Sequence, residues 1–555
     1  MKEEVGMKRR GPTWALVMLV AAGVVALTGS TALAQENIYE NYSGLTGGTG
    51  VVVGGTGEIT DSVDAGTALN PNGIGHYLVG TYYDVRQREA GGALYDQHNN
   101  IQIINNNTNN IELPICDGDN TIDGTDGAGC YEPLGGIYAK VRFRESKGST
   151  EAFDFVIALS CGEVWAARLQ LSEGGMPQIR SQFPVAGNPR GDGTIETKPY
   201  FNPDSPDFNF GFGGDSNTTF FGGGANKPAG ISDDDVQRGY FEVMALEALQ
   251  CEPDSGKLSL EGNTWTRVED QQGAHFAPTH ALGAEVFLVR PVQGISHNYN
   301  ATAITRVAQP LTAPSVVDIM LTPPTFSEFP TWETCTTKGD SDDCLSQANL
   351  ILSKSRVMAQ YDSETATGGS TNLVVTMPTK YANCGFNTTT GQWDNSPSGP
   401  FECAPAGEET VCTIYDRLEN LVEESEVPIS PAPPGAEPCR LPREVTVIGL
   451  SYQGGENAGA DFTINTSAIG PTAETGWFDL DLARNVSGAV IHSENIQQGA
   501  DPGVADILGI GVTGYHGLPV VGLVMQEFVN DNVGGVYGNT VAPLYEQVIL
   551  KEGQS

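Results

Sequence analysis

The chain has 555 residues, with 29 lysines and arginines against 68 aspartates and glutamates, so its formal net charge is −39 at pH 7. Only 17% of the residues are charged, so the acidity comes from scarce cations rather than from acidic tracts. Such a surface repels nucleic acids and anionic membranes, which we therefore exclude as partners, and it attracts divalent cations.

The N-terminus has the order of a secretory signal peptide. A basic stretch at residues 8–10 precedes an apolar run at 14–27, and a small-residue site ends at Ala34. This order predicts that residues 1–34 are cleaved off. The alternative is an uncleaved membrane anchor, but the run is short for a span of about 20 residues. We therefore expect a secreted protein, extracellular or at the cell surface with the periplasm as the alternative, and with no integral membrane segment after cleavage.

Strand patterns dominate the chain beyond a Gly/Thr-rich segment, residues 35–75, which predicts a flexible leader with at most one short strand. The clearest pattern is at 137–144, where apolar side chains alternate with polar ones, so that one face is expected to be buried and the other wet. Similar runs predict further strands at 77–85, 153–159, 164–171, 240–246, 286–289, 373–377, 445–450, 477–482, 520–525 and 545–550.

The fold class that follows is all-β with minor α. Short strands with turn signals between them favour antiparallel β-sandwich domains, and we place one at 76–315 and a second at 316–555. The best helix candidate is the stretch near 345–361, where apolar residues recur at roughly helical spacing. A Phe- and Gly-rich segment at 207–226 is interpreted either as a sticky surface element or, preferably, as a loop folded back over a sheet.

The wet face predicted at 137–144 is locally basic in a very acidic chain. It carries Tyr138, Lys140, Arg142 and Arg144. This face is suited to receive an acidic neighbour, including a second copy of the chain. The simpler interpretation, which we favour, is a ladder of charge pairs across neighbouring strands of the same molecule.

Ten cysteines follow the signal peptide, an even number, and none lies in a C-x-x-C motif. In an oxidising compartment this favours up to five disulfides, which would staple the sandwiches. Local bridges are expected for Cys116–Cys130, Cys335–Cys344 and Cys412–Cys439, which leaves Cys161–Cys251 and Cys384–Cys403.

One loop has the composition of a calcium site. Carboxylates at alternate positions of a glycine-bearing loop converge readily on Ca²⁺, which prefers oxygen ligands. The loop lies between Cys116 and Cys130, and it lacks the acidic twelfth residue of an EF-hand, so a solvated loop is the alternative. Its candidate ligands are Asp117, Asp119, Thr121, Asp123 and Asp126. The run Asp233-Asp234-Asp235 is a weaker candidate, because such runs usually supply turn residues or charges at a helix N-terminus.

Several short stretches, taken in order, resemble a family of uncharacterised secreted proteins of Gram-negative bacteria. The resemblance implies a shared extracytoplasmic fold and carries no activity, cofactor or site residue to this chain. The stretches span most of the chain after the leader and are Gly80-Thr81-Tyr82-Tyr83, Lys140-Val141-Arg142-Phe143-Arg144-Glu145, Phe153-Asp154-Phe155, Glu163-Val164-Trp165, Gly239-Tyr240-Phe241-Glu242-Val243, Val374-Val375-Thr376-Met377-Pro378-Thr379-Lys380 and Gly517-Leu518-Pro519-Val520.

Function is ranked from these observations. Export, strand-rich architecture and the lack of a G-x-S-x-G elbow or a phosphate-binding loop favour a non-enzymatic envelope or extracellular structural protein, self-assembling or bound to a cell-surface partner. An extracellular ligand- or glycan-binding adhesive module comes second, because the chain has six tryptophans for a sugar platform. An extracellular hydrolase comes third.

Overall fold

The computed structural model describes residues 68–106, 136–181, 219–312 and 352–551, with shorter gaps inside these stretches. The longest of those gaps are at 252–259, 266–273, 394–407, 419–428, 431–439, 484–491 and 494–511. The all-β prediction is confirmed: antiparallel sheets dominate, and the described α-helices are the one-turn elements α3 (Asp233–Val236) and α6 (Lys380–Asn383).

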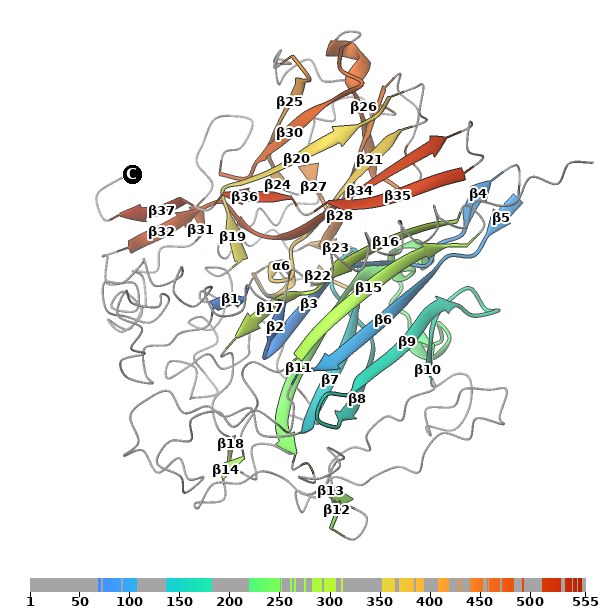
Figure 1. The fold of residues 1–555 in the computed structure, drawn as a ribbon, viewed down its shortest axis with the longest axis vertical. Helices are drawn as coiled ribbons and strands as arrows, with labels where there is room; N and C mark the ends of the chain where they lie inside the picture. The colour runs from blue at the N-terminus through green and yellow to red at the C-terminus, as the bar shows by residue number, and fades with distance from the viewer. Residues whose placement is uncertain are drawn as a thin grey trace, which may run out of the picture.

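The N-terminal half forms a sandwich of two sheets (Figure 1). The first sheet has the order β1 (Ala68–Asn70), β17 (Thr302–Thr305), β3 (Tyr77–Asp84), β11 (Arg238–Leu249), β7 (Gly136–Glu145) and β8 (Glu151–Leu159). The second sheet has the order β10 (Pro177–Ser181), β9 (Val164–Leu171), β6 (His98–Asn105), β15 (Leu282–Arg290) and β16 (Ile295–Asn300), and β2 (Ile74–Gly75) also pairs with β15.

The C-terminal half forms a second sandwich, which Figure 1 shows above the first. The third sheet has the order β26 (Ile429–Ser430), β29 (Phe462–Asn465), β28 (Val445–Ser451), β21 (Ser370–Thr376), β34 (Val521–Asn530) and β35 (Gly535–Val541), with β28 and β29 parallel. The fourth sheet has the order β25 (Val411–Asp416), β30 (Thr475–Asp481), β20 (Arg356–Asp362) and β36 (Leu544–Glu546).

Short strands and 3₁₀ turns complete the described elements. The two-stranded pairs are β4 (Arg88–Ala90) with β5 (Ala93–Tyr95), β12 (Leu260–Glu261) with β13 (Thr264–Trp265), β14 (Ala274–His275) with β18 (Leu311–Thr312), β19 (Ser353–Lys354) with β33 (Leu518–Pro519), β22 (Phe386–Asn387) with β23 (Gln392–Trp393), and β24 (Glu408–Glu409) with β27 (Arg440–Leu441). A three-stranded sheet joins β31 (His492–Ser493), β32 (Val512–His516) and β37 (Val548–Lys551), and the 3₁₀ turns are η4 (Phe220–Gly222) and η10 (Thr466–Ile469).

The third sheet is apolar on both faces and joins the two sandwiches. In β21, Leu373 and Val375 belong to the core shared with the fourth sheet, whereas Val374 belongs to the core of the N-terminal sandwich. Residues of β28 and β34 divide in the same way, with Val447 and Leu523 on the N-terminal side. Period-two alternation therefore gives one sheet two buried faces, and an apolar cluster crosses the predicted boundary at 315/316. The boundary itself lies outside the described residues, and the two-domain division stays a prediction.

Two local predictions were wrong. The helix expected near 345–361 is wrong over 353–361, where the chain forms β19 and then β20. Its alternate residues Val357, Ala359 and Tyr361 are buried, which is strand periodicity. The leader expected to be flexible over 35–75, with at most one short strand, lies outside the described residues up to 67, and its described end is corrected, because it contains two short strands, β1 and β2, which pair with β17 and β15.

The Phe-rich segment at 207–226 is described from Thr219 onward, and there it folds back over a sheet as favoured. Phe220 is fully buried and lies against Tyr83, Phe143 and Phe153, with ring centroids 5.2–5.9 Å apart.

Candidate functional site: a charged junction between the two sandwiches

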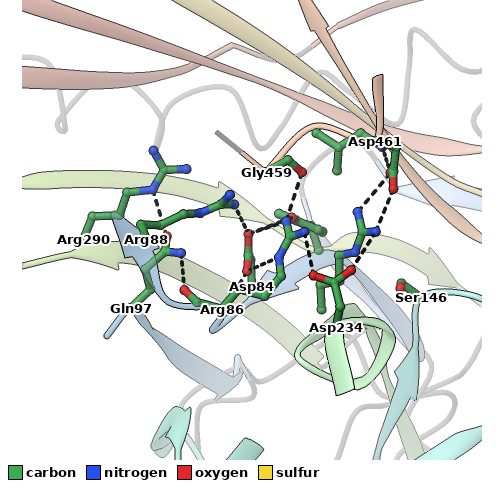
Figure 2. Close-up of polar contacts among 12 residues, drawn as sticks. Asp84, Arg86, Arg88, Gln97, Ser146, Asp234, Arg290, Gly459 and Asp461 are labelled. Carbon is green, nitrogen blue, oxygen red and sulfur yellow. Dashed lines mark hydrogen bonds and ion pairs between the residues drawn. The ribbon is translucent and has the colours of Figure 1, made fainter. Parts of the chain in front are cut away.

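Charged side chains from both sandwiches meet at one place, which we call the charged junction (Figure 2). It contains five arginines and five carboxylates, so its formal charges balance. Ion pairs of the junction cross between the sandwiches at Arg238–Asp461, Arg443–Asp235 and Arg290–Glu527. The ten residues are Arg86, Arg88, Arg238, Arg290, Arg443, Asp84, Asp234, Asp235, Asp461 and Glu527.

Asp84, at the end of β3, is the anchor on the N-terminal side. Its buried carboxylate accepts hydrogen bonds from Nε and Nη2 of Arg86, at 3.0 and 2.9 Å, and from Nη2 of Arg88 at 2.6 Å. Burial alone would raise the pKa of Asp84, but the two guanidinium groups outweigh it and hold the pKa well below 3.8. Arg86 also donates to the backbone carbonyl of Gly459 at 3.0 Å, which ties this anchor to the C-terminal sandwich.

Asp461 is the corresponding anchor on the C-terminal side. Nη1 and Nη2 of Arg238 donate to its two oxygens at 2.9 and 2.6 Å, a bidentate pair. Nε of Arg443 lies 3.3 Å from one of these oxygens, and the backbone N–H of Val447 donates to the other at 2.8 Å. One carboxylate thus holds β11, β28 and the turn before β28 together.

A third crossing lies where β15 and β16 approach β34. Arg290 pairs with Glu527, and its Nε donates to Gln97 Oε1 at 2.8 Å. Nε2 of His297 lies 3.5 Å from Glu527. Burial would raise the pKa of Glu527, but its hydrogen bond with His297 and the charge of Arg290 lower the pKa overall.

The Asp233–Asp235 run supplies helix-terminal charges to this junction rather than a metal cluster. The three residues form the first turn of α3, and Ser232 and Asp235 cap it reciprocally. Asp234 lies between Arg86 and Arg238, at 3.3 and 3.1 Å. Burial would raise the pKa of Asp235, but the charge of Arg443 and the cap hydrogen bonds lower it.

The basic strand is confirmed as β7, but its predicted wet face is wrong. Tyr138, Lys140, Arg142 and Arg144 are all buried, at 0–5% exposure. The favoured ladder of intramolecular pairs is present: Lys140 pairs with Asp154, Arg142 with Glu151, and Arg144 with Glu242 at 2.8 Å. The C-terminal sandwich covers part of this face, because the ring of Tyr381 lies 4.4 Å from the Arg144 guanidinium.

The predicted calcium loop, Asp117 to Asp126, lies outside the described residues and stays a prediction. Among the residues that are described, no group of three or more His, Cys, Asp or Glu side chains is arranged to hold a metal ion. No helix in that part of the chain is long and apolar enough to cross a membrane.

The predicted disulfide Cys161–Cys251 is present and ties the β8–β9 turn to the residues after β11. Cys412 is also oxidised, and its partner lies outside the described residues. The other expected bridges, which involve Cys116, Cys130, Cys335, Cys344, Cys384, Cys403 and Cys439, lie outside them as well.

Sequence reasoning missed the junction. Its arginines come from β3–β4, β11, β15 and the turn before β28, and only Asp233–Asp235 had stood out as a motif. The sequence signal that could have been used is the pattern Asp84-x-Arg86-x-Arg88, because a carboxylate followed by two arginines at alternate positions of an extended chain can form local ion pairs.

Comparison with known proteins adds no assignment: no family model, curated protein or solved structure matches this chain.

Proposed function

We propose that this protein is a secreted, non-enzymatic structural component of the cell envelope or extracellular surface. The charged junction is the observation that supports the proposal. It joins the two sandwiches through paired charges, most of them buried, and the third sheet adds an apolar core on each side. Two sandwiches joined in this way should keep their stability when the salt concentration changes, because buried ion pairs are screened far less than exposed ones.

Two further features support a place outside the cytoplasm. The chain begins with the basic, apolar and small-residue order of a signal peptide. Cys161 and Cys251 form a disulfide, and such bonds persist mainly in oxidising compartments. The strongly negative formal charge keeps exposed surfaces apart, so assembly at the surface would need divalent cations or a distinct partner.

The test is localisation of the full chain together with its redox state. Cells that express the full chain with a C-terminal tag are fractionated, the N-terminus of the product is sequenced, and free thiols are counted in the unfolded protein. We expect a mature N-terminus at Gln35, protein in the envelope or medium, and a blocked Cys161–Cys251 pair. Cytoplasmic protein with residues 1–34 retained and both thiols free would overturn the proposal.

The same purified protein tests its structural role. Sizing with Ca²⁺ and with a chelator is expected to show large particles that form reversibly with the cation. A monomer under both conditions, at concentrations near the cellular one, contradicts self-assembly and leaves attachment to a surface partner as the structural role. Glycan binding, the second candidate, is favoured by the second sheet, in which residues of β6, β9, β15 and β16 alternate between buried and exposed or partly exposed, so that one face is open.

A further inference from the structure

The second sheet has one buried and one exposed face across its strands. Residues of β6 alternate between buried and partly exposed, and β9, β15 and β16 continue the alternation. Because residues directly opposite each other in antiparallel strands share a face, the register places one row across all five strands. This row, which we call the arginine–amide row, contains Arg180, Arg168, Asn100, Phe287 and Asn298.

Two like charges stand directly opposite each other at one end of this row. Arg168 on β9 pairs in register with Arg180 on β10, and both side chains are exposed. Like charges in this position destabilise a sheet. Arg168 contacts Nε2 of His98 at 3.0 Å, and Arg180 donates to Gln178 at 3.2 Å. Neither arginine forms an ion pair within the described residues, whereas each arginine of the charged junction has a carboxylate partner.

The rest of the row is uncharged and consists of two amides and one aromatic ring. Asn100 makes no side-chain hydrogen bond within the part of the chain described, and Asn298 makes one long contact, 3.4 Å, to Glu285. Each amide donates and accepts at once, which suits a hydroxyl group that does the same. Phe287 stands between these two amides with its ring partly exposed. Strands about 4.8 Å apart spread the row over about 19 Å.

We propose that the arginine–amide row binds an acidic polysaccharide, with a uronate carboxylate on Arg168 and Arg180 and sugar hydroxyls on Asn100 and Asn298. Charge complementarity selects this ligand: two adjacent guanidinium groups fit a planar carboxylate. The neutral remainder of the row fits a ligand with few charges and many hydroxyls. Glu285, which contacts Asn298, lies at the end of the row opposite the two arginines. At physiological salt, charges beyond about 8 Å are largely screened, so the acidic groups of the protein do not cancel the attraction at the arginine end.

A nucleic acid is a poorer match to the same row. Single-stranded nucleic acids need a basic groove along the whole backbone with aromatic side chains for successive bases, whereas this row has cations at one end and a single aromatic ring. The inference rests on the proposed function only in that the ligand is a polymer found outside the cytoplasm. Binding of a purified glycan is measured independently of localisation, so the two proposals fail separately.

The test is binding of oligogalacturonate to the purified mature chain by titration calorimetry, with dextran and a single-stranded DNA oligonucleotide as comparison ligands. We expect oligogalacturonate to bind, to bind more weakly as salt is raised, and to bind at least about tenfold more weakly to the R168Q/R180Q double variant. Asn100→Ala is expected to weaken binding without changing its salt dependence. Arg417→Gln is the control for a change in net charge alone, because Arg417 is exposed in the other sandwich and its substitution removes one of the two positive charges that the double variant removes.

The thermal melt of the double variant provides a second readout. Its melting temperature is expected to equal or exceed that of the wild type, because removal of two opposed like charges relieves repulsion. A clearly lower melting temperature would mean that the arginines are neutralised by an acidic partner within the protein, which overturns the proposal. Failure of oligogalacturonate to bind, equal binding of dextran, tighter binding of DNA, or an equal loss in Arg417→Gln overturns it as well.

Discussion

The charged junction makes a quantitative prediction at Asp461. Replacement of Asp461 by Asn keeps the shape of the side chain and one acceptor oxygen but removes the charge that faces Arg238 and Arg443. Breaking a buried ion pair by removing one partner costs about 3–5 kcal/mol. Both arginines keep a second carboxylate, Asp234 at 3.1 Å from Arg238 and Asp235 beside Arg443. We therefore expect the lower end, a loss of about 3 kcal/mol in the free energy of unfolding.

Urea unfolding of the purified protein, followed by tryptophan fluorescence, measures this loss. A double-mutant cycle with Arg238→Met isolates the pair, and we expect a coupling energy of about 2 kcal/mol because the two residues share a bidentate contact. Arg417→Gln, at an exposed position without an ion pair in the described residues, should change stability by less than about 0.5 kcal/mol. Additivity of D461N and R238M within about 0.5 kcal/mol would refute the claim that this pair holds the sandwiches together.

Three further predictions concern other features of the fold. Replacement of Cys161 and Cys251 by Ser should cost about 2–5 kcal/mol in urea unfolding, and equal stability of the wild type with and without a reductant would contradict this. Burial lowers the pKa of His76 to about 4, so the unfolded chain binds a proton between pH 6.5 and 4 that the folded protein does not. His76 should therefore contribute a fall in stability of about 3 kcal/mol as the pH drops through this window, and a His76→Gln variant should have a shallower slope, with a remainder from His98, whose pKa is also lowered to about 4. Gly517 has φ +110°, and a Cβ there would lie 1.8 Å from the carbonyl oxygen of Lys354. Gly517→Ala should therefore lower the melting temperature far more than Gly294→Ala, because Gly294 also has a positive φ but has open space around it. Equal shifts of the melting temperature in the two variants would argue against the clash.

Strand positions were predictable because side-chain alternation is a local property. The run at 137–144 formed β7, and Leu373 to Met377 lies in β21 and its end. The same alternation was present in the stretch taken for a helix, since Val357, Ala359 and Tyr361 recur at every second position. There the approximate helical spacing of other apolar residues competed with it, and neither pattern alone decides between strand and helix in so short a run.

Which faces are covered was not predictable, because the covering residues lie far away in the sequence. The alternation within its own strand predicted that Arg144 is exposed to solvent, but the ring of Tyr381, more than 200 residues later in the sequence, covers its guanidinium group. The charged junction was hidden for the same reason: Asp84 and Arg86 form a local pair, whereas the contact of Arg238 with Asp461 spans 223 residues. A sequence alone does not show which distant residues pair in the fold, so each charge looks isolated, and isolated charges are usually solvated.

The junction and His76 respond to acid in different pH ranges, one below the other, which predicts the order in which parts of the fold open. The pKa values of Asp84, Asp235 and Glu527 are lowered in the folded protein, so these ion pairs contribute fully above the ordinary carboxyl pKa near 4 and are lost only as the pH falls through the lower folded values. His76 loses its contribution earlier, between pH 6.5 and about 4. It lies next to the first sheet, where it bonds to the backbone carbonyl of Ala245 at 2.6 Å. Acidification should therefore loosen β3 and β11 while the junction still holds the sandwiches together, and amide exchange at pH 4.5 should show new opening in β11 but continued protection in β28. Opening that begins in β28 would place the weakest point at the junction instead.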